Sequence, residues 1–367
     1  MDVDSYATRL AAVAEQASRL GIDAVLVTPG PDLQYLTGYD AVPLERLTCL
    51  IVPAHGPVGM VVPRLERLAA EASPVGRLGI DIHTWGETDD PCALVGSIVP
   101  GAKRVGLDNH MWAEKVLRLR DAMPTVEQVL AGGVISHLRM RKDAAEVQSL
   151  LTAGAAIDRV HDRVAGFLRP GRTEREVGAD IADAILTEGH VRVDFVIVAS
   201  GPNGASPHHE VSDRVIERGD PVVVDIGGTM PDGYRSDCTR MYSVGTPADV
   251  FVERYAVLQA AQAAAVRWAK AGVSCESVDA AARDLLTGAG LGDFFIHRTG
   301  HGIGLETHED PYIVSGNAQV LEAGMAFSIE PGFYCEGEFG ARVEDIVIAT
   351  EDGVLVANNG THELVQA

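Results

Sequence analysis

The sequence has few cysteines and contains no long apolar run. Its five cysteines are scattered, odd in number and without C-x-x-C spacing. This usage argues against a disulfide framework or a thiolate zinc site and fits a reducing compartment. No apolar run approaches the ~20 residues that span a bilayer. Residues 1–20 lack the basic start and apolar stretch of a signal peptide. We therefore expect a cytoplasmic protein with no membrane partner.

Positive charge is also scarce. Thirty Lys and Arg stand against 52 Asp and Glu, which gives a formal net charge of −22. Such a surface repels phosphate backbones, so we expect no nucleic-acid partner. A negative balance can reflect solubility alone, or it can include carboxylates that gather to hold cations. The positions of the acidic residues have to separate these two interpretations.

The length of 367 residues suggests two domains. Before residue 134, helical patterns alternate with short runs that are apolar on both faces, which is typical of a covered α/β sheet. The expected elements are a helix at 6–20 and strands at 22–28, 49–52, 58–62 and 105–107. A long helical pattern begins at Ala144. We place the boundary near Val134, which gives domains at 1–133 and 134–367.

The second domain contains an internal repeat. Gly171 and Thr173 begin one helical pattern, and Gly272 and Ser274 begin another 101 residues later, with matching apolar positions further along. Both expected N-caps carry hydroxyl groups, as the exposed amides of a first helical turn require. Two alanine-rich helices can resemble each other by chance. The acidic residues that follow each helix favour a duplication instead.

A hairpin with two aspartates follows the first of these helices. The β-branched strand 221–226 carries Asp225, a turn is expected at 230–233, and the return strand carries Asp237. Since the midpoint of the two aspartates is residue 231, we expect them to face each other directly. Opposed β-carbons lie only ~4.5–5.5 Å apart, and two like charges at that distance are destabilising unless a cation lies between them.

The second half repeats this arrangement with glutamates. Glu330 ends an apolar strand, Glu344 lies on the return strand, and their midpoint is Gly337 in the expected turn. The offsets from Asp225 and Asp237 are close to the helix offset. The repeat therefore predicts that four carboxylates converge.

Histidines accompany both hairpins. Glycines flank His301 on both sides and allow a close backbone approach. His208 and His308 occupy equivalent places in the two halves. A lone hairpin aspartate or a lone histidine beside glycines is usually structural, so it is the combination that indicates a metal site. Oxygen ligands with one imidazole suit divalent manganese, cobalt or zinc, and four carboxylates suit two ions about 3.5–4 Å apart.

At these residues the sequence resembles the metallopeptidases of the pita-bread fold. This family includes Xaa-Pro dipeptidase (prolidase), aminopeptidase P and methionine aminopeptidase, with creatinase as a metal-free relative. The resemblance covers nearly the whole chain, including the segment Tyr35-Leu-Thr-Gly38. It implies an α+β fold, in which a smaller α/β domain of the creatinase/prolidase type precedes a pita-bread catalytic domain with a duplicated helix–hairpin unit.

The resemblance also implies roles for individual residues. Two divalent metal ions are expected, manganese first and cobalt or zinc as alternatives. The implied metal ligands are Asp225, Asp237, His301, Glu330 and Glu344. The implied catalytic residues are Glu330, as proton shuttle, with His208 and His308. The implied substrate-binding residues are His208, His308 and Arg342, with His209 an open alternative to His208.

The reaction implied is hydrolysis of the peptide bond between an N-terminal residue and proline, through a hydroxide that bridges the two metal ions. The expected substrates are small proline-containing peptides, and the expected assembly is a homodimer. Two alternatives stay open. One is a creatinase-like hydrolase of another small amide or C–N bond, and the other is a non-catalytic binding relative.

One departure from the family bears on substrate length. From the resemblance to prolidases, an arginine would be expected downstream of the second histidine, where it would hold the dipeptide's C-terminal carboxylate. Here no Lys or Arg occurs between Glu309 and Ala341. The sequence therefore predicts weak length discrimination, with tripeptides cut at rates within about tenfold of dipeptides, a gap of ~1.4 kcal/mol.

Overall fold

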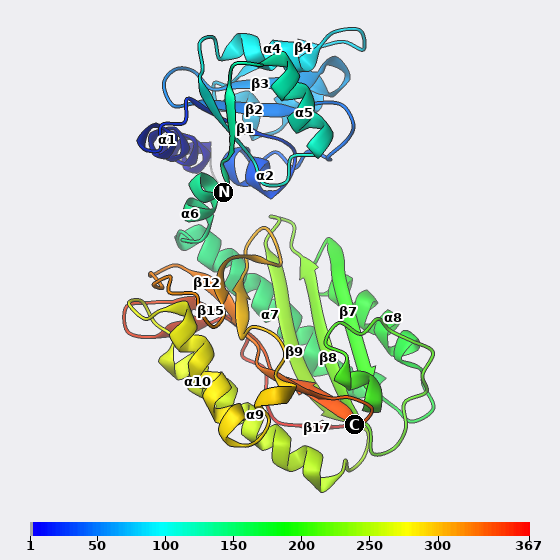
Figure 1. Ribbon diagram of the computed structural model, residues 1–367. Coiled ribbons are helices and arrows are strands. Elements are labelled where there is room, and N and C mark those ends of the chain that lie inside the picture. Colours follow the sequence, from blue (N-terminus) through cyan, green and yellow to red (C-terminus); the bar gives the residue numbers. More distant parts are fainter. Residues whose placement is uncertain (1–2) are drawn as a thin grey trace. The chain divides into compact units, whose positions relative to one another are not determined.

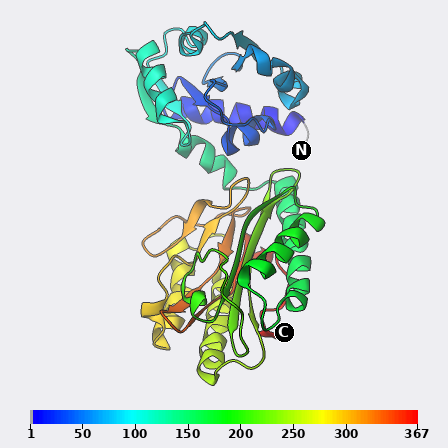
Figure 2. The same cartoon turned by 90° about the vertical axis from the view of Figure 1, so that its right-hand side faces the viewer.

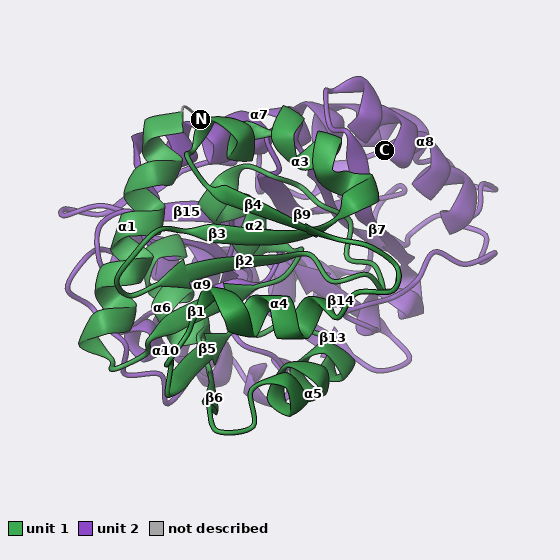
Figure 3. Cartoon of the chain, turned by 90° about the horizontal axis from the view of Figure 1, so that it is seen from above, with its two compact units in different colours: residues 1–139 green, residues 140–367 purple. Residues whose placement is uncertain are grey.

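A computed structural model describes residues 3–367, and the chain divides into two compact units (Figure 3). Unit 1 comprises residues 1–139 and unit 2 comprises residues 140–367. The boundary expected from the sequence, at Val134, lies inside α6 (Gly132–Arg139), the last helix of unit 1. Within residues 3–367, no helix is both long and apolar enough to cross a membrane.

Unit 1 is built on one six-stranded sheet with the order β4-β3-β2-β1-β5-β6 (Figure 3). Its strands are β1 (Ala24–Val27), β2 (Cys49–Pro53), β3 (Gly59–Pro63), β4 (Asp81–Trp85), β5 (Arg104–Leu107) and β6 (Glu127–Leu130). The four expected strands correspond to β1, β2, β3 and β5, which are almost wholly buried. The edge strands β4 and β6 were not expected, because their sequences are polar and partly exposed.

Helices cover the sheet of unit 1. They are α1 (Val3–Arg19), α2 (Pro31–Thr37), η1 (Arg64–Glu66), α3 (Arg67–Ala72), η2 (Pro74–Arg77), α4 (Pro91–Ile98) and α5 (Ala113–Ala122). Val95 of α4 and Leu119 of α5 are fully buried in one core with β1, β2 and β5. The expected amphipathic helix at 6–20 is α1. Burial of its apolar side, not helix propensity alone, holds such a helix in place.

The first half of unit 2 places two helices on a sheet whose three long strands are antiparallel, with the short β17 parallel to β9 at one edge (Figure 2). The helices are α7 (Ala144–Phe167) and α8 (Glu174–Thr187), followed by the short η3 (Gly201–Ala205). The sheet has the order β17-β9-β8-β7, with β7 (Arg192–Ser200), β8 (Pro221–Thr229), β9 (Arg235–Ser243) and β17 (Val365–Gln366). Thr173 caps α8 as expected, and Glu176 completes a capping box.

The second half repeats the pattern with α9 (Asp249–Trp268), α10 (Cys275–Gly288) and η4 (Gly292–Phe294). Its five-stranded sheet contains β10 (Gly300–Gly302), β11 (Glu309–Ile313), β12 (Ala326–Ile329), β15 (Asp345–Ala349) and β16 (Val354–Val356). A separate ribbon pairs β13 (Gly332–Cys335) with β14 (Phe339–Arg342). The strands of both halves lie between the two helix pairs of this unit (Figures 1 and 2).

The two halves match in detail at the start of α8 and α10. Gly171 and Gly272 both have φ of 92°, a value that side-chain-bearing residues rarely adopt. Thr173 forms an isolated bridge with Val215, and Ser274 forms the equivalent bridge with Val320. This geometry supports the duplication inferred from the sequence.

All five cysteines are unpaired and buried. Cys49 and Cys92 belong to unit 1, whereas Cys238, Cys275 and Cys335 belong to unit 2. Desolvation raises the pKa of each thiol, which keeps it protonated and unreactive in the folded chain.

Candidate metal centre and active site

The first hairpin carries its two aspartates on one face, but not directly opposed. In the β8–β9 ladder, Asp225 pairs with Thr239 and Asp237 pairs with Gly227. The expected direct pairing of the aspartates was therefore wrong. The turn centres on Asp232, one residue later than expected, so the aspartates are diagonal neighbours. Since side chains alternate with period two, both still point to the same side of the sheet.

The second hairpin keeps the expected centre at Gly337 but is broken where the glutamates lie. Cys335 pairs with Phe339 in the ribbon, and Ile329 pairs with Asp345 in the sheet, so one register runs through both. Glu330 and Glu344 lie in the interruption between them. There, the Glu330 backbone N–H donates to Thr299 O at 2.8 Å. The Glu344 N–H donates to Thr239 O at 3.2 Å, which joins this break to β9.

His301 on β10 completes the cluster. Its Nε2 lies 3.1 Å from Glu330 Oε1 and 3.7 Å from Asp237 Oδ2. Its Nδ1 donates to Gly302 O at 3.1 Å, so Nε2 is the ring nitrogen that faces the carboxylates and that could bind a metal ion on losing its proton. Asp237, His301 and Glu344 each offer one ligand atom, all within 4.8 Å of one another.

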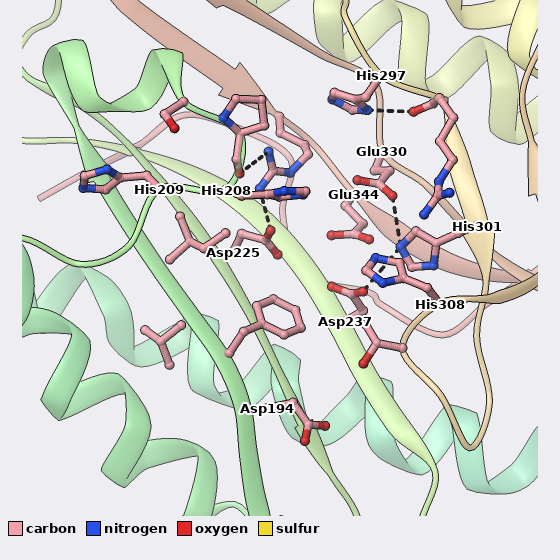
Figure 4. Close-up of a pocket in the computed structure, with 18 of the residues that line it drawn as sticks. Asp194, His208, His209, Asp225, Asp237, His297, His301, His308, Glu330 and Glu344 are labelled. Carbon is pink, nitrogen blue, oxygen red and sulfur yellow. Dashed lines mark hydrogen bonds and ion pairs between the residues drawn. The ribbon is translucent and has the colours of Figure 1, made fainter. Parts of the chain in front are cut away.

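All the expected metal ligands line one cavity of about 1010 Å³ (Figure 4). They are Asp225, Asp237, His301, Glu330 and Glu344. Figure 4 shows these side chains pointing toward a common space from both halves of unit 2. The structure thus brings together residues that are far apart in the sequence, since Asp225 and Glu344 are separated by 119 positions.

Two buried carboxylate oxygens in this cluster suit a cation. Among residues 3–367, no group hydrogen-bonds to Asp225 Oδ1 or to Glu344 Oε1. Burial raises the pKa of Asp225, and it raises the pKa of Asp237 and Glu344 well above the usual range. A divalent cation on these oxygens would favour their charged forms and supply the missing partner. The donor set therefore fits a hard or borderline divalent metal.

Glu330 differs from the other three carboxylates. Burial acts to raise its pKa, but the His301 hydrogen bond and the charges of His301, His297 and Arg342 outweigh it and lower the pKa to about 2. The Ser328 hydroxyl also donates to Glu330 Oε1 at 2.9 Å. Glu330 is thus the member of the cluster whose negative charge this chain's own groups support best.

Arg342 is buried and fully engaged with the site. Its Nη2 donates to Asp225 Oδ2 at 2.5 Å, and its Nη1 donates to Tyr334 Oη at 2.8 Å. Its Nε donates to Thr239 Oγ1 at 3.1 Å. The expected role of Arg342 as a substrate-binding residue thus competes with a clear structural role, which is to orient Asp225.

The structure separates the two neighbouring histidines. His209 Nε2 lies 2.7 Å from Glu174 Oε2, in a network beside the cavity. Both histidines line the cavity, but Figure 4 shows the His208 ring near the Asp225 carboxylate while His209 lies apart from the other labelled side chains. Of the two, His208 is therefore the one positioned to meet a substrate.

His308 lies against the metal cluster. Its ring packs edge-on to the His301 ring with centroids 4.2 Å apart. Burial, followed by the charge of His301 and of Arg298, lowers the pKa of His308 to about 4. A neutral imidazole at this place can donate one hydrogen bond toward the cavity.

Several residues of the site escaped the sequence analysis. Glu174, in the first turn of α8, accepts hydrogen bonds from Ser200, Asn203 and Ser212 as well as from His209. These bonds outweigh its burial and lower the pKa of Glu174 to about 2. An acidic residue in a first helical turn is too common to have indicated this role.

Arg298 also lines the cavity, three residues before His301. The family resemblance implies a carboxylate-binding cation only downstream of His308, so Arg298 was not among the predicted site residues. The guanidinium lies over the ring of Tyr312, 4.5 Å from the centroid. Proximity between residues 298 and 312 was not visible in any pattern of the sequence.

Comparison with known proteins agrees with this geometry and defines the class. Residues 148–351 match the model of metallopeptidase family M24, and residues 9–141 match that of the creatinase/prolidase N-terminal domain. The chain therefore belongs to metallopeptidase family M24, and this membership implies divalent metal ions. The expected α+β fold with a pita-bread catalytic domain is confirmed.

Particular relatives are similar over almost their whole length. The probable dipeptidase PepE of Mycobacterium tuberculosis is 52% identical over 365 residues, which cover 99% of this chain and 97% of that protein. The Xaa-Pro dipeptidase of Lactobacillus helveticus is 36% identical over 335 residues, 88% of each chain. The crystal structure of dipeptidase PepE from Mycobacterium ulcerans has a TM-score of 0.96 at 53% identity and covers 100% and 99% of the two chains.

Proposed function

We propose that this chain hydrolyses the peptide bond between an N-terminal residue and proline in small peptides. The observation that carries the proposal is the cavity in which five ligand-type side chains converge around two unpartnered buried carboxylate oxygens. Membership of a metallopeptidase family supports the hydrolytic reaction. Similarity to the Xaa-Pro dipeptidase of Lactobacillus helveticus supports the choice of the Xaa-Pro bond.

The proposed metal ligands are those expected from the sequence, namely Asp225, Asp237, His301, Glu330 and Glu344. Manganese is our first choice, and cobalt or zinc are alternatives, because oxygen ligands with one imidazole suit these ions. Two such ions, when bound, would lower the pKa of a shared water to supply hydroxide near neutral pH and would polarise the scissile carbonyl.

The remaining chemistry falls to the side chains. Glu330 takes the proton of the attacking water and passes it to the nitrogen of the leaving proline. His208 and His308 donate hydrogen bonds to the oxygen that becomes negative in the tetrahedral intermediate. Arg342 holds Asp225 in place through the 2.5 Å contact and so fixes the ligand geometry.

Two further expectations belong to this proposal. Five unpaired buried thiols support a reducing compartment such as the cytoplasm. The homodimer stays a prediction from the family resemblance.

The test is a substrate screen after dialysis against a chelator and addition of manganese or cobalt. We expect metal-dependent cleavage of Ala-Pro and other Xaa-Pro peptides. Cleavage of a guanidino compound or a ring amide without cleavage of Ala-Pro would favour the creatinase-like alternative. Binding of these compounds without turnover under any metal would favour the non-catalytic alternative.

A further inference from the structure

The cavity holds two arginines with very different surroundings. Arg342 is 3% exposed and committed to Asp225, Tyr334 and Thr239. Arg298 is half-buried, and its guanidinium face rests on the Tyr312 ring. Within residues 3–367, no carboxylate forms an ion pair with Arg298. Arg298 is thus a cation that the fold places in the cavity without a counter-charge.

Such an arrangement is unusual for this chain. Acidic residues outnumber basic ones by 52 to 30, so carboxylates are plentiful. Most other buried or half-buried arginines of unit 2 form an ion pair with a carboxylate. Stacking on an aromatic ring holds the guanidinium plane and leaves its N–H edge free to donate. A planar fork of donors matches a carboxylate with two parallel hydrogen bonds.

The surroundings indicate what the missing partner is. The same cavity contains the proposed metal ligands, His208 and His308, so anything that reaches Arg298 lies beside the reacting bond. Arg298 acts on His308 electrostatically, which places its charge close to a group proposed to contact substrate. Asp194, which also lines the cavity, is paired with Arg235 and Arg192 and does not compete for Arg298.

We propose that Arg298, held by Tyr312, binds a carboxylate group of the peptide substrate. This inference rests on the proposed function. Every Xaa-Pro dipeptide carries such a group at its C-terminus, and an acidic side chain on the N-terminal residue is the other source. If the C-terminus is the source, Arg298 replaces the arginine that the sequence lacks after Glu309. Dipeptides are then preferred over tripeptides, contrary to the expectation from the sequence.

The test compares the native chain with Arg298→Gln on three peptides. These are Ala-Pro, its C-terminal amide, and Asp-Pro amide, which carries only a side-chain carboxylate. Arg267→Gln is the matched control, because Arg267 is an exposed residue of α9 that does not line the cavity. We expect Arg298→Gln to lower kcat/KM for Ala-Pro by about 10- to 100-fold, the worth of a charge-assisted pair. Metal content and the Ala-Pro amide rate should stay unchanged.

The outcomes separate the two sources. A loss confined to Ala-Pro assigns Arg298 to the C-terminal carboxylate, and native Ala-Pro should then exceed Ala-Pro-Ala by more than about tenfold. A loss confined to Asp-Pro amide assigns it to the side chain. An equal loss on all three peptides, or no loss on any, overturns the proposal.

Tyr312 supplies a second variant. Tyr312→Leu removes the stacking face but no charge, so it should cause a smaller loss on the same peptide that Arg298→Gln affects. Tyr312→Phe keeps the ring and should restore the rate. A Tyr312→Leu loss that is equal on all three peptides would contradict the positioning role.

Failure of the proposed function is distinguishable from failure of this inference. If the native metal-loaded chain cleaves none of the three peptides, the proposed function is wrong. The uncleaved peptides then serve as ligands in calorimetry. Equal affinities of the native chain and Arg298→Gln for all three would overturn the inference as well, and a selective loss of affinity would sustain it.

Discussion

The two halves of unit 2 carry the same helix–hairpin plan but build their acidic pairs differently. The first hairpin is continuous. It has nine paired positions, of which the first pairs Pro221 with Ser243 and the last pairs Thr229 with Arg235. The second is split between a sheet and a ribbon at the place where Glu330 and Glu344 lie. Pro331, which has no backbone N–H, directly follows Glu330 and ends β12 there.

This difference shows what a break in a ladder can do. The continuous hairpin fixes two short aspartates as diagonal neighbours on a rigid face. The break frees the Glu330 and Glu344 backbone groups to bond with Thr299 and Thr239 instead of with each other. The second half thereby reaches across to the first, and the longer glutamate side chains complete a site to which both halves contribute.

The halves also anchor their histidines in parallel ways. In the first, Glu174 of α8 binds the segment that carries His208 and His209. In the second, Asp279 of α10 accepts hydrogen bonds from Thr299 N at 3.1 Å and Thr299 Oγ1 at 2.7 Å, just before His301. An acidic residue on the equivalent helix therefore holds the histidine segment in each half, with a non-ligand histidine in one case and a proposed ligand in the other.

The largest expected effect tests whether both halves are needed for metal. Asp225→Asn and Glu344→Gln should each abolish activity and lower bound metal while leaving the fold largely intact, because a neutral amide cannot balance a dication. Metal analysis, circular dichroism and Ala-Pro hydrolysis check this. Full activity with two metals per chain in either variant would contradict the ligand assignment.

The next effect tests the non-ligand histidines. His208→Ala and His308→Ala should keep their metal and lose about 10²–10⁴-fold in kcat, the usual worth of a proton-transfer or oxyanion partner. His209→Ala is the control from the same segment, and it should lose less. Loss of metal from His208→Ala or His308→Ala would show that ligand and non-ligand histidines have been exchanged.

A smaller effect separates the two anchors. Asp279→Asn should weaken metal affinity about 10-fold or more, because outer-shell partners of a ligand typically cost this much. Glu174→Gln should leave metal affinity unchanged and lower kcat, because it loosens only the His208 segment. Metal titration with a competing chelator measures the first, and steady-state kinetics the second. The same response in both variants would remove the proposed distinction between the anchors.

The smallest expected effect is a pH dependence of stability that arises from Glu174. Its pKa is lowered from 4.5 to about 2 in the folded chain. A lowered pKa stabilises the fold above pH 4.5, and the contribution, about 3 kcal/mol at most, disappears as the pH falls toward 2. The difference in urea unfolding free energy between the native chain and Glu174→Gln should shrink over this range. A difference that stays constant from pH 7 to pH 2 would contradict this contribution of Glu174.

Much of this architecture follows from local pattern. The apolar runs predicted the buried strands of unit 1, and the turn glycine at 337 predicted the second hairpin's centre, since Gly337 has φ of 77°. The centre of the first hairpin was missed by one residue, which shifts the pairing by two, because Met230-Pro-Asp-Gly233 indicates a turn without fixing its length. Strands β4 and β6 were missed because edge strands need no apolar alternation.

The candidate site was predictable where residue type and spacing recur, and not where contacts are tertiary. The repeat itself indicated that Asp225, Asp237, Glu330 and Glu344 gather. Nothing local, however, indicates that His209 turns to Glu174 while His208 faces the cavity. The stacking of Arg298 on Tyr312 likewise depends on how β10 and β11 pair.

The buried thiols allow the rate of local opening to be measured separately for each unit. Because alkylation requires an exposed thiolate, the folded chain should resist iodoacetamide, and each cysteine should react only as fast as its surroundings open. Cys49 and Cys92 then report on unit 1, and Cys238, Cys275 and Cys335 report on unit 2. Peptide mass spectrometry of partly alkylated chains would therefore measure the opening rates of the two units separately in one sample, with no substitution introduced. Cys238 lies on β9 next to Asp237, so its alkylation rate should fall when metal binds. The alkylation rates of Cys49 and Cys92 should not change.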